Sequence, residues 1–283
     1  MKRIMINTVE LYMHTRKGEE RMSFELNHVC PGVTHIRDAM GVCMTLIAGE
    51  KAALLVDTGY GTEDVAAFVR TLTDKPLTVL LTHNHHDQAL GARWLDQTVM
   101  FPEDMAEWSA FTGMEKRKVV LRQAIGKGLP VAESDFLRGE CRMPLTMSKG
   151  TFDLGGLTVE VIPCPGHTPG SCVVYVPTHK LLITGDDWNP CTWLFFEAAL
   201  PVRQYRAIVS TLLALDFTHV LCSHQIDVFP RAKFVDFLNG LTDATLNAAK
   251  PVTIAGYEHI NTHQADVAEG QILVFDWNKY KEA

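Results

Sequence analysis

Three histidines and an aspartate lie within five positions of this chain, directly after an apolar run. The run at 77–81 predicts a central strand buried on both faces, and its carboxyl end is followed by His83, His85, His86 and Asp87. Imidazole nitrogens and carboxylate oxygens are ligands of zinc and neighbouring divalent metals, whereas closely spaced imidazoles offer little to an apolar core. The sequence therefore predicts a metal site at this strand end. Asp87 also begins a predicted helix, so an N-cap is a second interpretation of it.

Three further candidate ligands follow predicted strands. His167 lies in a turn rich in proline and glycine, and Asp186 and His224 each follow an apolar strand. Each residue alone also has a structural interpretation, because histidines occur in turns and on surfaces, and aspartates begin turns and helices. Taken together with the cluster at 83–87, they supply donors for a site that holds two metal ions.

Length and composition indicate one large soluble domain. The chain has 283 residues, of which 47% are hydrophobic, so it can bury a substantial core. The formal net charge of −7 argues against nucleic acid as a partner, and we interpret the basic run at 116–118 as a solvated helix face. No apolar run approaches the roughly 18 residues of a membrane helix, and the first residues lack the pattern of a signal peptide. We therefore expect a cytoplasmic protein without a membrane partner.

The cysteines do not indicate a disulfide framework. Seven of them are scattered along the chain, and none has Cys-x-x-Cys spacing. We expect free thiols that are mostly buried. Cys164 and Cys222 lie near candidate ligands in the sequence, and we interpret both as packing residues.

Apolar periodicity predicts strands with helices on their outer faces. Expected strands lie at 42–48, 53–56, 77–81, 157–162, 172–176, 181–184 and 220–222. Expected helices lie at 62–72, 102–128, 205–215 and 232–249. The helix at 102–128 begins with Pro102, a residue that the first helical position tolerates.

The combined pattern resembles the metallo-β-lactamase superfamily. The motif of that family is His-x-His-x-Asp-His followed by a later His, an Asp and a final His. These positions correspond here to His83, His85, Asp87, Gln88, His167, Asp186 and His224. Supporting signatures lie at 56–61, 165–170 and 184–186, so the resemblance spans about 42–224.

The resemblance implies an α+β fold, a four-layer αβ/βα sandwich of two mixed β-sheets flanked by helices. We expect a single domain over 1–283, with a helical insertion at about 102–128 and a C-terminal elaboration at about 225–283. The metals would lie in a cleft at one edge of the two packed sheets.

The resemblance also implies roles for the candidate residues. His83, His85 and His167 would bind the first metal ion. Asp87 and His224 would bind the second ion, and Asp186 would bridge the two ions. Asp57 would orient ligands without binding metal, as the outer residues of such sites commonly do. Its other interpretation, a turn residue before Gly59, is compatible with that role.

Gln88 departs from the motif, because the family usually has a histidine there that binds the second ion. An amide oxygen is a weaker and harder donor than an imidazole nitrogen, although it remains a candidate ligand. We therefore expect an altered second site that binds zinc weakly, prefers iron or manganese, or stays empty. We interpret His86 as a residue of the cleft wall, because a shift by one position aims it away from the ligand role.

The function implied by the resemblance is metal-dependent hydrolysis of a small ester, thioester, lactone or related metabolite by a metal-bound hydroxide. Asp87 and Asp186 are the candidate catalytic residues, and Asp87 would accept or relay a proton. Two alternatives stay open because of Gln88. One is a mononuclear iron oxygenase or related redox enzyme, and the other is a ligand-binding protein without catalysis.

Aromatic residues after Asp186 are candidates for an apolar pocket that receives a small-molecule substrate. They include Trp188 and Trp193, followed by Phe195 and Phe196. Aromatic residues in a mixed apolar segment also occur in cores, so packing is the competing interpretation. Nearer the C-terminus, further candidates for the cleft are Tyr257, His259 and His263. The helical segment at 102–128 would serve as a lid or as the face of a homodimer.

Overall fold

The computed structural model describes residues 2–6, 9–16 and 19–282, so the two limits of the expected domain, Met1 and Ala283, lie outside the described residues. A first sheet contains the first nine described strands. It is antiparallel from β1 to β6 and parallel from β6 to β9. Its strands are β1 (Lys2–Ile6), β2 (Val9–Arg16), β3 (Glu19–Cys30), β4 (Val33–Asp38), β5 (Cys43–Ala48), β6 (Ala53–Val56), β7 (Leu77–Leu80), β8 (Val99–Met100) and β9 (Leu145–Thr146).

A second mixed sheet contains β10 (Gly150–Asp153), β11 (Thr158–Pro163), β12 (Cys172–Val176), β13 (Leu181–Ile183), β15 (His219–Cys222) and β16 (Gln225–Pro230). A third, smaller sheet has the order β14 (Cys191–Leu194), β19 (Gln271–Asp276), β18 (Thr262–Ala268) and β17 (Lys250–Pro251). The third sheet adds to the two that the sequence predicts. β16, at the start of the expected C-terminal elaboration at about 225–283, is an edge strand of the second sheet.

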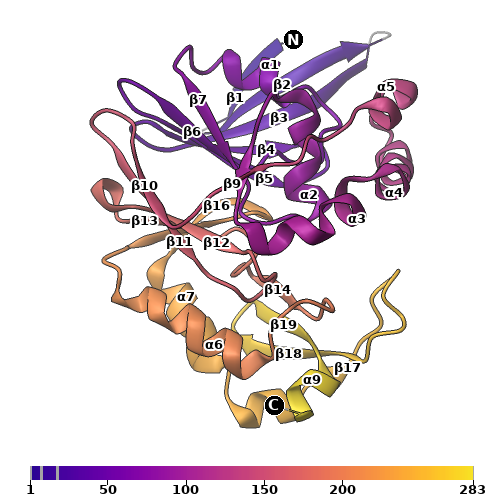
Figure 1. The fold of residues 1–283 in the computed structure, drawn as a ribbon, viewed down its shortest axis with the longest axis vertical. Coiled ribbons are helices and arrows are strands. Elements are labelled where there is room, and N and C mark those ends of the chain that lie inside the picture. The colour runs from indigo at the N-terminus through magenta and orange to yellow at the C-terminus, as the bar shows by residue number, and fades with distance from the viewer. Residues whose placement is uncertain (1, 7–8, 17–18, 283) are drawn as a thin grey trace.

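Alternating side chains on the strands build the layers. Leu54 and Val56 of β6 pack inward against the second sheet, whereas Leu55 packs outward against α1 (Val65–Arg70). In β13, Leu181 packs inward and Leu182 packs outward. The outward face of the second sheet is covered by α6 (Val202–Thr211) and α7 (Arg231–Gly240). The predicted four-layer αβ/βα sandwich is therefore confirmed (Figure 1).

Helix boundaries differ from the predictions where side chains cap the backbone. Asp64 accepts a hydrogen bond from the amide of Ala67, so α1 begins after the predicted start at 62. The interpretation of Asp87 as an N-cap is wrong, because His85 occupies that position of α2 (His86–Ala89). Asp87 lies in the first turn of α2, where its negative charge faces the positive end of the helix.

The segment at 102–128 is not one helix. It consists of a 3₁₀ helix η2 (Pro102–Glu107), α3 (Trp108–Thr112) and α4 (Met114–Gly126), because Gly113 is extended and breaks the run. The basic run at 116–118 is not entirely a solvated face. Arg117 is buried and donates hydrogen bonds to the carbonyl oxygens of Leu137 and Gly139.

The remaining described helices are short. They are η1 (Leu90–Trp94), α5 (Glu133–Arg138), η3 (Pro177–His179), η4 (Leu212–Ala214), α8 (Asp243–Asn247) and α9 (Trp277–Glu282). Within the described ranges, no helix has the length and apolar character needed to cross a membrane.

Close packing between α7 and β18 depends on Gly240. A Cβ atom at this position would lie 1.6 Å from the carbonyl oxygen of Val267, so the helix would have to move. We expect Gly240→Ala to lower the free energy of unfolding by about 1–3 kcal/mol, as overpacked sites do. Urea unfolding of both proteins measures this difference.

The matched control is Gly126→Ala at the end of α4, where an added Cβ would have no neighbour within 4 Å. Alanine is the better helix former, so this variant should be neutral or more stable by up to about 1 kcal/mol. Equal unfolding free energies for the two variants would contradict the packing argument.

Candidate metal centre

Two clusters of potential metal ligands meet at the edge shared by the two large sheets. The first contains His83 and His85, from the loop between β7 and α2, and His167, from the loop between β11 and β12. The second contains Asp87 of α2, Asp186 from the loop after β13, and His224 from the turn between β15 and β16. Within each cluster, one ligand atom per residue lies within 4.8 Å of the others.

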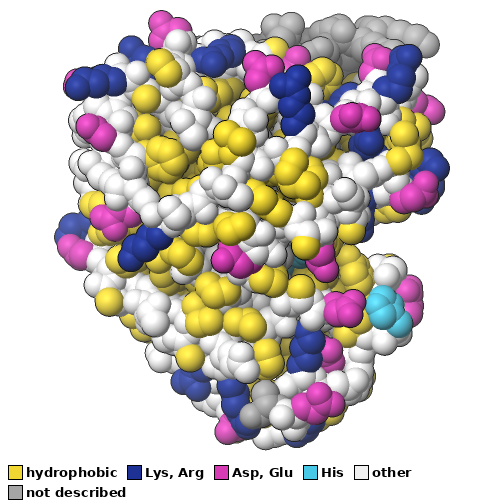
Figure 2. All heavy atoms as spheres, in the orientation of Figure 1, with side chains coloured by type: hydrophobic (Ala, Val, Ile, Leu, Met, Phe, Trp, Pro, Cys, Tyr) yellow, Lys and Arg dark blue, Asp and Glu magenta, His cyan; other side chains and the backbone are white. Residues whose placement is uncertain are grey.

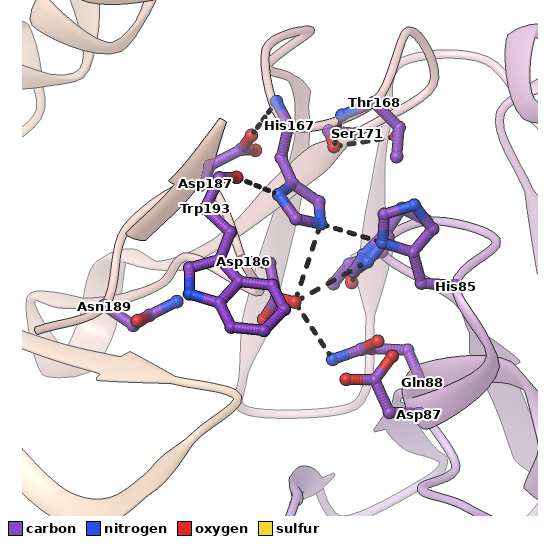
Figure 3. Close-up of polar contacts among 12 residues, drawn as sticks. His85, Asp87, Gln88, His167, Thr168, Ser171, Asp186, Asp187, Asn189 and Trp193 are labelled. Carbon is purple, nitrogen blue, oxygen red and sulfur yellow. Dashed lines mark hydrogen bonds and ion pairs between the residues drawn. The ribbon is translucent and has the colours of Figure 1, made fainter. Parts of the chain in front are cut away.

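The carboxylate of Asp186 lies between the two clusters. Its Oδ2 atom is 3.7 Å from Nε2 of His83 and 3.6 Å from Nε2 of His167, and its Oδ1 atom is 3.2 Å from Nε2 of His224. Figure 3 shows this carboxylate with His167 and Gln88 directed toward it from separate elements. The structure thus brings all the ligands expected from the sequence into one place. The buried Nε2 atom of His83 accepts no hydrogen bond within the described chain, as suits a donor reserved for a metal ion.

Outer hydrogen bonds fix the orientation of two imidazoles. Nδ1 of His167 lies 2.7 Å from the carbonyl oxygen of Trp193, so Nδ1 carries the proton and Nε2 is left as a donor atom for metal. Nδ1 of His83 lies 3.1 Å from Oγ1 of Thr82. That hydroxyl and the Thr82 amide both donate to Asp57. Asp57, which has a positive φ of 65°, therefore reaches His83 through Thr82.

Burial and the charges of neighbouring residues shift the pKa values of the histidines in the two clusters. Burial lowers the pKa of His83 to about 3, and the neighbouring His167 adds to this effect, so His83 is neutral at pH 7. Burial also lowers the pKa of His85 well below its usual value. Burial also lowers the pKa of His224, but the carboxylates of Asp186 and Asp87 outweigh it and raise that pKa to about 9. A cation in the second cluster must therefore displace a proton from His224.

Gln88 is fully buried beside the second cluster. Its Nε2 atom donates to Oδ2 of Asp186 over 3.4 Å, and its Oε1 atom has no hydrogen-bond partner within the described chain. The backbone carbonyl of Gln88 accepts from the amide and the hydroxyl of Thr58. The amide side chain is thus held against Asp186, and the second cluster has three donors without it.

Asp104 is a positioning residue that the sequence analysis missed. Its carboxylate accepts hydrogen bonds from the amide of Gly170 at 2.7 Å, the hydroxyl of Thr168 at 2.7 Å and the amide of Asn84 at 3.3 Å. Burial raises the pKa of Asp104, and these hydrogen bonds oppose that shift. Asp104 therefore joins the loop of His83 to the loop of His167. An acidic residue in a predicted first helical turn gives no sequence signal for such a role.

A cavity of about 440 Å³ opens over the clusters. The lining residues that the structure describes are Tyr60, His85, His86, Asp87, Phe111, Gln123, His167, Asp186, Asn189, Cys191, Trp193, Phe196, His224, Ala255 and Tyr257. His86, which the sequence places at the cleft, lies in the wall with its ring 5.6 Å from that of Tyr60. Trp193 is also in the wall. All seven cysteines lie in the described chain and are free, and Cys191 is exposed at the cavity.

Trp188 does not line the cavity, so that prediction is wrong. Its side chain is fully buried in the core between the second sheet and α7, where it packs edge-on against Phe229 and Phe234. Its Nε1 atom donates to Oε1 of Gln271 over 3.1 Å. The turn after Asp186 directs this side chain into the core, which periodicity alone does not reveal.

Two C-terminal histidines that the sequence considers for the cleft also lie outside it. His259 is exposed, and His263 stacks on Trp277 with ring centroids 4.2 Å apart. Tyr257, the third candidate from this region, does line the cavity.

Asp104→Asn tests whether Asp104 holds the two ligand loops. The amide would retain the volume but would lose the charge that binds three donors, so we expect metal affinity to fall about 10–100-fold, as for other residues that support metal ligands. Titration with zinc against a competing chelator measures this affinity. Glu103→Gln, on the exposed side of η2, is the control and should bind like the unaltered protein. Equal affinity of both variants would show that Asp104 does not position the loops.

Comparisons with known proteins place these features in a family. A family model described as the metallo-beta-lactamase superfamily matches residues 38–186. An uncharacterized protein of Mycobacterium leprae is 29% identical over 227 residues, which are 74% of this chain and 99% of that protein. The acyl-coenzyme A thioesterase MBLAC2 of Gallus gallus is 23% identical over 172 residues, or 53% of this chain and 59% of the thioesterase.

A solved structure supports the same fold. The sec-alkylsulfatase Pisa1 from Pseudomonas sp. matches with a TM-score of 0.59 and 16% identity, over 78% of this chain and 42% of the sulfatase. The family match covers more than half of the chain and includes the loops of His83, His85, His167 and Asp186. Together with the two ligand clusters at the sheet edge, this match shows that the chain belongs to the metallo-β-lactamase superfamily and is a metallohydrolase.

Proposed function

We propose that the protein hydrolyses a small ester, thioester or lactone with two zinc ions. The observation that carries this proposal is the presence of two clusters of three potential ligands each beside one cavity, with Asp186 between them. His83, His85 and His167 would hold the first ion. Asp87, Asp186 and His224 would hold the second. Zinc, when bound, polarises a carbonyl oxygen and lowers the pKa of water to about 7.

The residues of the cavity supply the rest of the chemistry. Hydrolysis joins a water oxygen to the carbonyl carbon of the substrate and breaks its bond to the leaving oxygen or sulfur. The carboxylate of Asp87 lies in the cavity wall, where it can accept the proton of the attacking water and pass it to the leaving group. Thioesters are included because the relative from Gallus gallus is named as an acyl-coenzyme A thioesterase.

The second cluster favours hydrolysis over redox chemistry at a single iron. A mononuclear oxygenase needs only one set of ligands around a single iron, typically two histidines and one carboxylate. Here the second cluster also has three convergent donors, Asp87, Asp186 and His224, even though Gln88 replaces the usual histidine. A binding protein without catalysis would have no need to keep Asp87 and Asp186 buried beside each other at the cavity.

Turnover by metal-loaded protein tests the proposed function. We expect hydrolysis of at least one class in a panel of esters, thioesters and lactones, loss of turnover on chelation and recovery on adding zinc. Asp186→Asn should lower kcat/KM at least about 100-fold, since it weakens both clusters and removes a charge at the reacting centre. Asp227→Asn, at an exposed strand position, is the control. One bound iron per chain with oxygen consumption would contradict hydrolysis.

Gln88→His tests the account of the second ion. An imidazole at this position would add a donor to the second cluster, so we expect that ion to bind at least about tenfold more tightly, a change of about 1.4 kcal/mol. Metal analysis after dialysis against graded zinc measures the occupancy. Gln123→His places the same residue elsewhere in the cavity wall and should leave the second affinity unchanged. Unchanged occupancy in Gln88→His would refute this account.

A further inference from the structure

We propose that the cavity selects an uncharged aromatic acyl group, which names the substrate class of the proposed hydrolase and rests on that function. The cavity has two kinds of wall. Metal-ligand residues form one side, and the side chains of Phe111, Trp193, Phe196 and Tyr257 form much of the other. All four aromatic side chains are half-buried, so each leaves part of its ring open to the cavity.

Separate segments build this aromatic wall. Phe111 belongs to α3, Trp193 to β14, and Tyr257 to the loop at 252–261 between β17 and β18. In Figure 1 this loop extends opposite α3 and α4 on the right of the molecule, and Figure 2 shows the surface hollowed between them. The wall therefore combines the helical segment after Pro102, the segment after β13 and the C-terminal elaboration, outside the strands that precede the metal-ligand residues.

The wall begins at a metal ligand and leads away from it. The ring of His85 lies between Phe111, at a centroid distance of 4.4 Å, and Phe196, at 4.5 Å. Phe196 in turn lies 5.4 Å from Tyr257, nearly edge to face. A substrate whose carbonyl group lies at the metal centre would direct its acyl group along these rings. Planar rings at such distances prefer another aromatic ring as a partner over a saturated chain.

Charge restricts the acyl group further. No lysine or arginine belongs to the lining in the described chain, and the ionisable lining groups are the ligand residues, His86, two tyrosines and Cys191. Lys116 is not a lining residue, and its ammonium lies 5.5 Å from the centroid of Phe111, where it interacts electrostatically with Asp87. A carboxylate on the acyl group would lose its hydration against the aromatic rings without gaining a cationic partner there. The cavity therefore disfavours acyl groups that carry a distal negative charge.

The wall is held rigidly. The ammonium of Lys279 in α9 donates to the carbonyl oxygens of Phe196 at 2.8 Å, Glu197 at 2.5 Å and Ala199 at 2.8 Å. Fully buried Phe195 supports the wall from behind, with ring centroids 4.5 Å from Phe196 and 5.3 Å from Tyr257. A wall fixed before binding selects shape at a lower entropic cost than a mobile one.

Three thioesters with the same ethanethiol leaving group test the proposal on the zinc-loaded protein. Their acyl groups are phenylacetyl, cyclohexylacetyl and 4-carboxyphenylacetyl, so they differ only in aromaticity or in charge. An aromatic pair contributes a factor of about 2–10, so contacts with several rings should favour phenylacetyl over cyclohexylacetyl at least about tenfold in kcat/KM. The carboxylated substrate should be slower than phenylacetyl by at least about 100-fold, since its charge lacks a partner.

Tyr257→Ala should reduce the ratio of phenylacetyl to cyclohexylacetyl turnover by about 2–10-fold, because it removes one aromatic partner. His259→Ala, on the same loop but exposed and outside the lining, is the matched control and should keep the ratio. The proposal is overturned if the phenylacetyl and cyclohexylacetyl thioesters turn over equally. It is also overturned if the carboxylated thioester turns over as fast as the phenylacetyl thioester, or if Tyr257→Ala leaves the ratio unchanged.

Binding separates failure of this inference from failure of the hydrolase function. Calorimetric titration of the zinc-loaded protein with phenylacetamide and cyclohexylacetamide needs no turnover. If no panel substrate reacts but phenylacetamide binds at least about fivefold more tightly, aromatic selection stands and the hydrolase function fails. If substrates react but the two amides bind equally, the hydrolase function stands and aromatic selection fails.

Discussion

The metal centre depends on the contact between Asp186 and the histidines of the opposite sheet. Asp186 follows a strand of the second sheet, whereas His83 follows a strand of the first, so their approach joins the two halves of the sandwich. Gly185 permits this approach, because it has a positive φ of 55° and an added Cβ would lie 2.9 Å from Oγ1 of Thr82. A side chain at this position would move Asp186 away from the histidines of both clusters. One small residue therefore lets a single carboxylate lie within 4 Å of His83, His167 and His224.

The sequence identifies the residues of the two clusters because their signal is local. Apolar runs mark the strands, and chemically distinctive side chains follow them, so His167 and His224 can be identified without any long-range contact. Trp188 and Asp104 show where this reasoning fails. The direction of Trp188 depends on the turn after Asp186, and the role of Asp104 depends on partners up to 66 positions away. Neither property follows from periodicity, since both arise only when the sheets pack.

The ligand clusters and the aromatic wall lie on different parts of the fold. Loops at the ends of sheet strands carry the two ligand clusters, and such loops are held by the most buried part of the molecule. The aromatic wall comes from α3, the segment after β13 and the loop before β18. Segments of this kind vary without disturbing a core, so one scaffold can serve many substrates. Under the proposed function, these segments would therefore select the substrate, and no ligand motif describes them.

The anchoring of Phe196 by Lys279 has a consequence for heat sensitivity. α9 has only six residues, and short helices open locally at a smaller free-energy cost than the central strands. When α9 opens, the hydrogen bonds from the Lys279 ammonium to three backbone carbonyls break, and the loop of Phe196 is released. The metal-ligand residues at the sheet edges stay in place. Warming would therefore first make the protein less discriminating among acyl groups, at temperatures where metal is still bound and both large sheets remain folded.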